Sequence, residues 1–434
     1  MKVLIVGGGG REHALAWGIH QSSLHPTIVC IPGNAGTAKL GKNVFIPLTQ
    51  INEIVDYVSY QKFDLIVIGP EEPISQGLGD RLIEKGYRVF APSSRAARLE
   101  SSKASAKKLM TDEGIPTSSF RVFKEYSSLL AYLESSKYPL VLKASGLAAG
   151  KGTFICQSFE EANTTARLLM MEKILGEAAD EVVVEEFLIG SEVSIMAIAD
   201  GADDFLLPPS RDHKRAFDGD HGPNTGGMGV ICPVVDLKPE EERIIEEKIV
   251  KQILKALEKQ GSHFKGCLYP GLMMTREGPF VLEINVRFGD PETQAVVPLL
   301  NFDLLELFAE TVEGNLKGWL NSHLPDNKDW RELCRPMWAV TVVIASGGYP
   351  GQYQKGIPIK KLPKEKPELI VFHAGTEQRT DGLYTAGGRV FSVTGLGETL
   401  EMARERAYRA VREVEFEGMF YRKDIGVNPS NGVE

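Results

Sequence analysis

The chain has 434 residues, 43% of them hydrophobic and 25% charged, and its formal net charge at pH 7 is −9. This composition is typical of a globular protein of two to four domains, and the negative charge argues against a nucleic-acid partner. Five separate cysteines without a C-x-x-C pair exclude a disulfide framework and a zinc motif, and the chain lacks a signal sequence and any apolar run of membrane-spanning length, so we expect a cytoplasmic protein.

Residues 1–100 predict a doubly wound α/β domain. Short strands rich in Val, Ile and Leu, as in buried parallel sheets, are expected at Lys2–Val6, Thr27–Ile31, Leu65–Ile68 and Arg88–Ala91. Each strand is followed by a turn containing Gly, Pro or Asn. In this architecture such turns gather at the carboxyl edge of the sheet, where ligands bind.

The first of these turns, Gly7–Gly10, opens a helix whose backbone N–H groups can bind an anion. Glu12 stands where a dinucleotide fingerprint requires a third glycine, and the strand ending at Ile31 lacks an acid for the ribose. An NAD site is therefore disfavoured, while a phosphate site and a ligand-free tight turn both remain open.

A helical connection at 101–117 leads to a smaller α/β unit at about 118–192. Its expected elements are strands Pro139–Lys143, Thr153–Cys156 and Glu181–Glu185 and a helix over Glu160–Leu175. The segment from Lys143 to Thr153 is not a Walker A motif, because only three residues separate Gly146 from Gly150 and Gly152 replaces Ser or Thr. It predicts a mobile loop with a lysine on each side that can clamp a polyphosphate; a solvated hairpin is the alternative.

The hairpin Cys267–Arg287 carries the most informative pattern of the chain. Strand alternation predicts one apolar face made of Phe280, Leu282, Ile284 and Val286. Glu283, Asn285 and Arg287 are expected on the opposite face. A carboxylate, an amide oxygen and a guanidinium suit a hard divalent cation beside a phosphate. The pattern predicts a magnesium–nucleotide site, with an ordinary solvated strand face as the alternative.

Two further segments favour function. Glu185–Glu192 ends a strand and can offer backbone groups to an adenine and a carboxylate to a ribose. Residues 211–229 form a long glycine-rich loop, and loops of this length inside a domain are usually functional or disordered. A helix is expected over Glu240–Gln260, and a last unit begins with strand Met337–Ala345 and ends with helix Glu398–Glu415.

In this order the segments resemble the phosphoribosylamine–glycine ligase family of the ATP-grasp superfamily, over about residues 1–425. The motifs that carry the resemblance are Val-Gly-Gly-Gly-Gly-Arg-Glu-His (6–13), Pro-Gly-Asn-Ala-Gly (32–36), Gly-Pro-Glu-Glu-Pro (69–73), Lys-Ala-Ser-Gly-Leu-Ala-Ala-Gly-Lys-Gly (143–152), Asp-His-Lys-Arg (212–215), Pro-Asn-Thr-Gly-Gly-Met-Gly (223–229) and Asn-Val-Arg-Phe-Gly-Asp-Pro-Glu (285–292).

The resemblance implies an ATP-grasp α/β fold with an amino-terminal doubly wound parallel domain (1–100) and an ATP-grasp region (101–330) that includes a small mobile lid at about 118–192. A carboxy-terminal α+β domain (331–426) and a loose tail (427–434) complete it. The implied reaction joins 5-phosphoribosylamine and glycine, through glycyl phosphate, to give glycinamide ribonucleotide, ADP and phosphate in purine biosynthesis. Because multifunctional relatives carry further domains downstream, we expect this chain to have a single activity.

The resemblance also implies roles for individual residues. Glu283 and Asn285 would hold Mg²⁺ or Mn²⁺, and Arg287, Asp212 and Lys214 would be catalytic. ATP would contact Lys103, Lys143, Lys151, Glu185, Glu186, Phe187, Leu188, Glu192, Arg215 and Asn224. Glycine and 5-phosphoribosylamine would contact Gly9, Asn34, Glu72, Gly226, Gly227 and Met228. We expect a monomer or weak homodimer with no nucleic-acid or membrane partner.

The sequence is also compatible with three other functions. Another ATP-grasp ligase or carboxylase of a purine intermediate would share the fold and the phosphoryl chemistry, and glycine against bicarbonate dependence would separate it. A non-catalytic nucleotide-binding module would not need Glu283 and the two lysines. A Rossmann oxidoreductase would bind a nicotinamide cofactor.

Overall fold

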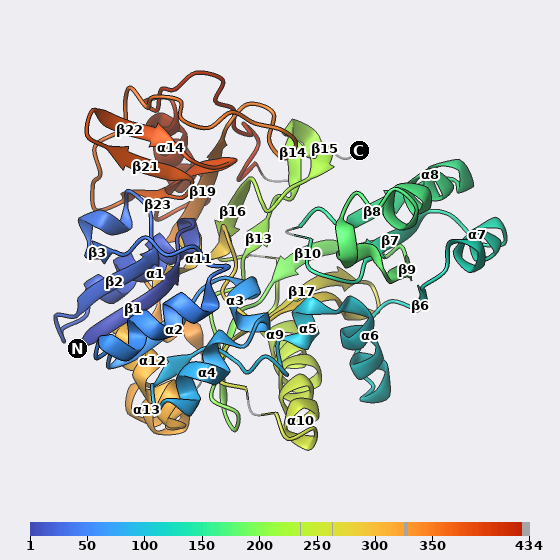
Figure 1. The fold of residues 1–434 in the computed structure, drawn as a ribbon, viewed down its shortest axis with the longest axis horizontal. Coiled ribbons are helices and arrows are strands. Elements are labelled where there is room, and N and C mark those ends of the chain that lie inside the picture. Colours follow the sequence, from blue (N-terminus) through green and yellow to red (C-terminus); the bar gives the residue numbers. More distant parts are fainter. Residues whose placement is uncertain (149, 235, 263, 325–328, 428–434) are drawn as a thin grey trace.

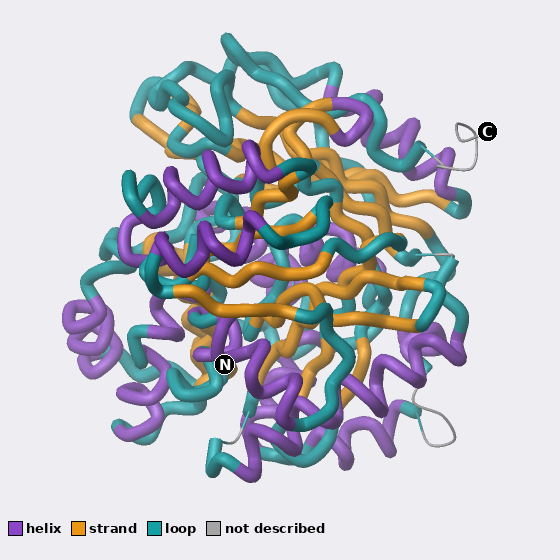
Figure 2. The backbone as a smooth tube through the Cα atoms, turned by 90° about the vertical axis from the view of Figure 1, so that its right-hand side faces the viewer, coloured by secondary structure: helices purple, strands orange, loops and turns teal. Residues whose placement is uncertain are grey.

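The structure, a computed structural model, describes residues 1–148, 150–234, 236–262, 264–324 and 329–427. The predicted loose tail lies, from residue 428 onward, outside the described residues. Within the described ranges, no helix combines the length and apolar character that a membrane span requires. Strands occupy the centre of the molecule and helices lie around them (Figures 1 and 2).

The amino-terminal sheet is parallel throughout, with strand order β3-β2-β1-β4-β5, and it confirms the four predicted strands. Its strands are β1 (Lys2–Gly7), β2 (Thr27–Pro32), β3 (Lys42–Asn43), β4 (Leu65–Ile68) and β5 (Val89–Phe90). The two-residue β3 carries no hydrophobic run, so sequence periodicity could not reveal it. The helices of this part are α1 (Gly10–His20), α2 (Ile51–Tyr60), α3 (Glu71–Ser75) and α4 (Leu78–Glu84).

The centre of the molecule is an antiparallel sheet ordered β10-β17-β11-β12, with β18 paired to β17. Its strands are β10 (Ser191–Ser194), β11 (Ala197–Ala199), β12 (Asp204–Leu206), β17 (Gly266–Thr275) and β18 (Gly278–Asn285). Helices α5 (Arg98–Ser101) and α6 (Lys103–Asp112) contact β18 of this sheet, and Ser102 caps α6 by accepting from the Ser105 N–H. The predicted helix over 240–260 is α9 (Pro239–Ile245), a π-helical turn (Glu246–Val250) and α10 (Lys251–Lys259).

A smaller unit stands out from this body on the right of Figure 1. It contains β6 (Phe120–Phe123), α7 (Tyr126–Glu134), β7 (Leu140–Ala144), β8 (Thr153–Cys156), α8 (Phe159–Met170) and β9 (Val182–Glu186). The sheet order is β6-β9-β7-β8, and its apolar side chains form a cluster separate from the other cores. We refer to residues 118–192 as the lid.

The carboxy-terminal sheet is ordered β13-β16-β19-β23-β20 and recruits two strands from the middle of the chain. These are β13 (Arg211–Asp212) and β16 (Gly229–Cys232), joined to β19 (Trp338–Ala345), β20 (Leu369–His373) and β23 (Arg389–Gly397). Helix α14 (Leu400–Val411) packs on this sheet, and it confirms the charged helix that the sequence predicted near the end of the chain. The segment between β13 and β16, which contains the hairpin β14 (Arg215–Phe217) and β15 (His221–Asn224), is therefore held by the carboxy-terminal part.

The remaining elements complete the body. Helices α11 (Glu292–Val296), α12 (Leu304–Glu313) and α13 (Leu316–His323) follow β18, and the hairpin β21 (Thr376–Arg379) and β22 (Gly382–Thr385) lies beyond β20. Helix α11 begins directly after the polar loop that follows β18, and it contacts α1, β16 and β19. It thus connects the central hairpin to the amino-terminal and carboxy-terminal sheets.

Candidate active site

A bulge in the central hairpin decides which side chains of β18 reach the cavity. Opposite Gly271 and Leu272, β18 places Glu283 and Val281, so Leu282 is the extra residue. The predicted apolar face is wrong in this part: Val281 is fully buried in the core, while Leu282 lines the cavity. Beyond the bulge the predicted alternation holds, with Ile284 in the core and Glu283 on the cavity face.

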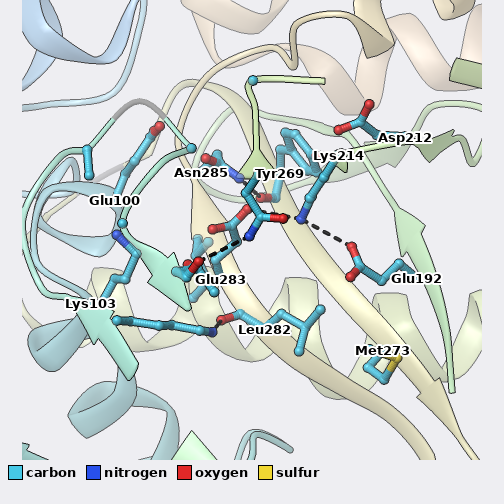
Figure 3. A pocket seen from close by; sticks show the side chains of 18 of the residues that line it. Glu100, Lys103, Glu192, Asp212, Lys214, Tyr269, Met273, Leu282, Glu283 and Asn285 are labelled. Carbon is cyan, nitrogen blue, oxygen red and sulfur yellow. Dashed lines mark hydrogen bonds and ion pairs between the residues drawn. The ribbon is translucent and has the colours of Figure 1, made fainter. Parts of the chain in front are cut away.

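The cavity that receives this face has a volume of about 740 Å³ and is lined by every part of the fold. Figure 3 shows Glu283 and Asn285 pointing into it, opposite Lys103 and Lys214. The predicted site residues that line it are Lys103, Lys143, Glu185, Glu186, Phe187, Leu188, Glu192, Asp212, Lys214, Arg215, Asn224, Gly226, Glu283, Asn285 and Arg287. Residues predicted from motifs far apart in sequence thus meet at one place.

One end of the cavity contains a buried cluster of two lysines around one carboxylate. Lys107 Nζ lies 2.8 Å from Glu185 Oε2, and Lys143 Nζ lies 3.0 Å from Glu185 Oε1. Although burial opposes ionisation, the two ammonium groups lower the pKa of Glu185. Burial lowers the pKa of Lys107 to about 8 even beside this carboxylate. Because one Glu faces two Lys, the cluster carries excess positive charge, which suits an anionic ligand.

Lys103 extends this positive end. Its side chain donates to the carbonyl of Gly146 in the lid at 3.2 Å, and burial lowers its pKa. Next to it, the Glu185–Leu188 segment lines the cavity with Phe187 and Leu188 half-buried. The side chain of Glu185 is occupied by the lysines, so any contact of this residue with a nucleobase is left to its backbone.

In the middle of the cavity Lys214 lies between two carboxylates (Figure 3). Its Nζ is 3.2 Å from Glu192 Oε2 and 3.5 Å from Glu283 Oε1. The ammonium of Lys214 lowers the pKa of Glu283 to about 2. Glu283 is therefore ionised at neutral pH and, with a third of its side chain exposed, remains accessible from the cavity.

The guanidinium of Arg287 is held by two acids from the amino-terminal part. It lies 3.1 Å from Glu71 Oε2 and 2.8 Å from Glu100 Oε1. Although burial opposes it, Arg287 and then Arg11 lower the pKa of Glu71 to about 2. Burial raises the pKa of Glu100 in spite of Arg287, so the two acids differ in their readiness to hold a proton.

The end of the cavity nearest the carboxy-terminal sheet contains Asp212 and Glu292. Glu292 Oε1 accepts a 2.6 Å hydrogen bond from the Tyr269 hydroxyl. Burial, and then the charge of Glu292, raise the pKa of Asp212, and its Oδ1 has no hydrogen-bond partner. A buried unpaired acceptor costs free energy unless a ligand supplies a donor. Asp212 is thus suited to receive an N–H group.

Six predicted residues lie outside the lining of the cavity. Lys151 donates to the Pro350 carbonyl at 2.8 Å, so the structure does not pair it with Lys143 across a phosphate-sized gap. Glu72 is exposed, whereas its neighbour Glu71 lines the cavity. Met228 is fully buried in the protein interior. Gly227 packs directly against Asp212 and Pro291.

The predicted contacts Gly9 and Asn34 lie at the edge of the amino-terminal sheet. The Gly9 N–H donates to Glu12 Oε2 at 2.7 Å, so the carboxylate that replaces the third glycine of the fingerprint takes a helix-start N–H for itself. Asn34 Nδ2 donates to the Gly8 and His373 carbonyls, and Asn34 Oδ1 accepts from the Gly36 N–H. Asn34 therefore joins the amino-terminal turns to β20.

The three parts of this fold match one known protein family. The phosphoribosylglycinamide synthetase family matches in its three parts: the N domain at residues 1–100, the ATP-grasp (A) domain at 101–293 and the C domain at 339–428. The chain belongs to the phosphoribosylglycinamide synthetase family. The predicted family resemblance is thereby confirmed, and with it the ATP-grasp fold.

Relatives in this family cover nearly all of this chain. The phosphoribosylamine–glycine ligase of Caldanaerobacter subterraneus is 45% identical over 98% of this chain and 99% of its own. The trifunctional purine biosynthetic protein adenosine-3 of Homo sapiens is 41% identical over 98% of this chain, which spans 42% of the human protein.

Solved structures agree with this assignment. The phosphoribosylamine–glycine ligase of Thermotoga maritima superposes with a TM-score of 0.83 at 37% identity, covering 98% of this chain and 100% of that one. The biotin carboxylase domain of the 2-oxoglutarate carboxylase of Hydrogenobacter thermophilus superposes with a TM-score of 0.74 over 96% of this chain and 91% of its own, at 17% identity. At that identity the likeness shows a shared fold.

Several residues that line the cavity could not be predicted from the sequence. Lys107, Glu100 and Arg389 come from helices or strand ends without a recognisable motif, and only the tertiary structure brings them to the site. Glu71 lies in the motif at 69–73, in which the predicted contact was its neighbour Glu72. Glu292 lies in the Asn-Val-Arg-Phe-Gly-Asp-Pro-Glu motif (285–292), but the motif alone does not indicate its role. For Lys107, the sequence signal is a charged residue on the apolar face of a helix.

The cavity also contains oxygen ligands that suit a divalent cation. Among the described residues, no group of three or more His, Cys, Asp or Glu side chains could hold a metal ion on its own. Glu283 and Asn285 nevertheless place an ionised carboxylate and an amide oxygen on one strand face beside the cationic cluster. Such a pair fits Mg²⁺ or Mn²⁺, which usually take one or two protein oxygens and leave the remaining positions to phosphates and water.

Proposed function

We propose that this chain catalyses the ATP-dependent ligation of glycine to 5-phosphoribosylamine, giving glycinamide ribonucleotide, ADP and phosphate. The observation that carries the proposal is the cavity itself: it combines a buried cationic end, an ionised Glu283 and an Asp212 whose Oδ1 has no hydrogen-bond partner, in a chain that belongs to this family. The activity would belong to purine biosynthesis, as the names of the relatives indicate.

The cationic end would bind the nucleotide. Lys103 and Lys143 would contact the phosphates, and the backbone of Glu186–Leu188 with the Glu192 carboxylate would hold adenine and ribose. Arg215 and Asn224 reach the same space from the β14–β15 hairpin, where Asn224 Nδ2 donates to the Thr153 carbonyl of the lid at 3.1 Å. Lys151 would join them when the lid rearranges around the phosphates.

Glu283 and Asn285 would hold Mg²⁺ or Mn²⁺. When bound, the cation would neutralise phosphate charge and polarise the γ-phosphate. Lys214, already held between Glu192 and Glu283, would stabilise the charge that develops during transfer. The side chain of Arg287, fixed by Glu71 and Glu100, would hold an oxygen of the transferring group without reorientation.

Asp212 and the Gly226–Gly227 backbone would receive glycine. A carboxylate and an amine do not condense in water, so the glycine carboxylate would first attack the γ-phosphate to give glycyl phosphate. The nitrogen of 5-phosphoribosylamine would then displace phosphate. The ribosylamine would approach from the amino-terminal turns near Gly9, Asn34 and Glu72, and the chain's main contribution would be positioning and charge neutralisation.

We also propose the division into an amino-terminal domain, an ATP-grasp region with a lid, and a carboxy-terminal domain as the functional one, supported by the separate apolar cluster of the lid. We infer a cytoplasmic monomer or weak homodimer. The five cysteines are all unpaired and buried, which suits a reducing compartment. Sedimentation across a range of concentrations would test the assembly.

The deciding experiment measures ADP release with ATP and Mg²⁺ while each co-substrate is omitted in turn. The proposal expects release that requires both glycine and 5-phosphoribosylamine. Release that depends on bicarbonate instead of glycine would favour a carboxylase, and release without either co-substrate would contradict a ligase.

A further inference from the structure

Two side chains of the carboxy-terminal sheet hold the backbone of Gly226 from both sides. Arg389 Nη1 donates to the Gly226 carbonyl at 2.5 Å, and the Gly226 N–H donates to the Tyr349 hydroxyl at 3.1 Å. Both polar groups of this glycine are therefore fixed by residues more than 120 positions away in sequence. The same Arg389 nitrogen donates to the Asp290 carbonyl at 2.7 Å, which joins the glycine loop to the loop after β18.

The two side chains are themselves rigidly placed. Arg389 begins β23 and pairs, after a bulge in the ladder, with Ala345, the last residue of β19, and Tyr349 lies in the turn that follows. The ring of Tyr349 packs so closely on Gly388 that a Cβ there would lie 2.3 Å from the ring. The Ser346 N–H closes this turn by donating to the Gly388 carbonyl at 2.8 Å. One sheet end thus presents both groups to the loop.

The loop held in this way lies directly against Asp212. A Cβ built on Gly227 would lie 2.6 Å from Asp212 Oδ1 and 2.4 Å from Pro291, and Gly227 has a φ of +110°, which disfavours any side chain. A Cβ on Gly226 would lie 3.1 Å from the Arg389 guanidinium. Thr225, Gly226 and Asp212 line the cavity, and the two glycines of this part of its wall pack closely against Arg389, Pro291 and Asp212.

We propose that Arg389 and Tyr349 determine amino-acid specificity by holding the Gly226–Gly227 backbone as a fixed wall beside Asp212. The inference rests on the proposed function, in which Asp212 receives the amino acid. A wall that cannot move leaves space for glycine and excludes an α-substituent. Both residues are positioning residues, because they act through the loop. Pocket contacts alone discriminate one methylene by about 10- to 200-fold, so loosening the wall lowers discrimination.

The test compares kcat/KM for glycine and for alanine, with saturating ATP and 5-phosphoribosylamine, in the full-length protein. Tyr349→Phe removes the hydroxyl that accepts from Gly226, and Arg389→Lys keeps the charge but loses the planar set of donors. Tyr353→Phe is the matched control: its ring lies 6.2 Å from that of Tyr349, and no hydrogen bond of its hydroxyl occurs among the described residues.

We expect the KM for glycine to rise by about two- to tenfold in Tyr349→Phe, the factor that one net hydrogen bond carries. The glycine-to-alanine ratio falls by a similar factor, and the KM for ATP stays within about twofold because the lysine cluster lies at the other end of the cavity. Arg389→Gln loses more discrimination than Arg389→Lys. Tyr353→Phe keeps wild-type values, and thermal unfolding confirms that each variant is folded.

The failure of this inference differs from that of the proposed function. Wild-type protein without glycine-dependent ADP release overturns the proposed function and the inference with it. Wild-type turnover with unchanged glycine-to-alanine ratios in both Tyr349→Phe and Arg389→Lys overturns the inference alone. An equal loss of discrimination in Tyr353→Phe also overturns it, because the effect would then follow from packing of the turn.

Discussion

Three ionised groups of this cavity, Glu283, Glu185 and Arg287, have a defined counter-charge before any ligand arrives. Glu283 faces Lys214, Glu185 faces Lys107 and Lys143, and Arg287 faces Glu71 and Glu100. Preorganised charges need no reorientation during the reaction, which is the main source of electrostatic catalysis. The arrangement also means that replacing one residue alters the behaviour of its partner.

At Glu283 we expect the change to glutamine to abolish most activity while the fold survives. The substitution removes the ionised oxygen proposed for the metal and leaves Lys214 with Glu192 alone. Loss of an outer-shell partner of a metal ligand already lowers activity or metal affinity by about 10- to 100-fold, and loss of the ligand itself should cost at least as much. Steady-state turnover across Mg²⁺ concentrations measures the effect, with the exposed Glu277→Gln at the hairpin turn as control. Near-normal turnover at ordinary Mg²⁺ would show that the metal assignment is wrong.

At Lys107 we expect the change to methionine to destabilise the protein. Lys107 Nζ also donates to the Thr117 and Ser118 hydroxyls, and its removal leaves the buried Glu185 with Lys143 as its one cation. Breaking a buried ion pair costs about 3–5 kcal/mol in the free energy of unfolding.

Denaturant unfolding of Lys107→Met, Glu185→Gln and the double variant tests this coupling. The double variant should lose less stability than the two single losses added together, since the second change removes the carboxylate that the first left with one cation instead of two. Strictly additive losses would mean that the two residues do not interact as the structure indicates.

Residue-level prediction from sequence succeeded where a motif fixes both the residue type and the strand end. Lys143 ends an apolar strand and Glu283 alternates with core residues, so their exposure to one cavity could be predicted. Lys107 and Arg389 could not be predicted, because their partners are distant in sequence and no local pattern encodes a tertiary contact. Glu72 and Glu71 are adjacent acids, and helix α3 alone decides that Glu71 faces Arg287.

At the scale of elements, the bulge in β18 shows how one extra residue redirects a strand. Before the bulge Val281 packs in the core, and after it Ile284 and Val286 do so, which leaves Glu283 and Asn285 on the cavity face. Strict alternation placed Leu282 in the core, whereas its side chain lines the cavity and its carbonyl accepts from Lys143 Nζ at 2.9 Å. A bulge depends on the partner strand, so the sequence of one strand does not reveal it.

The described residues of the lid loop at 146–153 contact the rest of the molecule at few positions. Lys151 donates to the Pro350 carbonyl at an exposed position, Asn224 donates to the Thr153 carbonyl, and Gly150 packs against the Thr225 carbonyl. Segments with so few side-chain contacts open at low free-energy cost. Binding of a nucleotide between the loop and the lysine cluster would add contacts to it.

We therefore expect hydrogen exchange at the described residues of 146–153 to be fast in the free protein and slowed by ATP with Mg²⁺. The strands β7 and β9 of the lid serve as internal control, since their exchange is protected by the sheet in both states. Equal protection of the loop with and without nucleotide would contradict a mobile lid. Lys151→Met should weaken the ATP-dependent slowing without changing exchange in the strands.

At the scale of the whole molecule, the amino-terminal and carboxy-terminal sheets are joined by a pair of buried histidines. The His373 N–H donates to His13 Nδ1 at 2.8 Å, and the His373 carbonyl accepts from Asn34 Nδ2 at 2.8 Å. The two imidazole rings lie 5.6 Å apart, and Lys39 Nζ is 3.4 Å from His373 Nε2. The cavity is lined by both terminal parts, so this junction also fixes the shape of the site.

The histidine pair predicts loss of stability in mild acid. Burial, and then the charge of Lys39, lower the pKa of His13 to about 3; burial, and then His13, lower that of His373 to about 2. In the unfolded chain both titrate near pH 6.5. The unfolded state therefore binds more protons than the folded state below that pH. The contribution of the two histidines to the free energy of unfolding is complete above about pH 6.5. It falls by about 1.4 kcal/mol per pH unit for each histidine as the pH decreases toward 3.

Replacing His13 by glutamine separates this effect from general acid denaturation. The glutamine oxygen can accept from the His373 N–H but does not titrate. The slope of the unfolding free energy against pH between pH 6 and 4 should therefore decrease by about 1.4 kcal/mol per pH unit, which is the contribution of one histidine. Denaturant unfolding at several pH values measures both slopes, and His25→Gln, at an exposed position of the amino-terminal part, is the control. Parallel slopes for His13→Gln and wild type would mean that His13 does not hold the two sheets together as a neutral group.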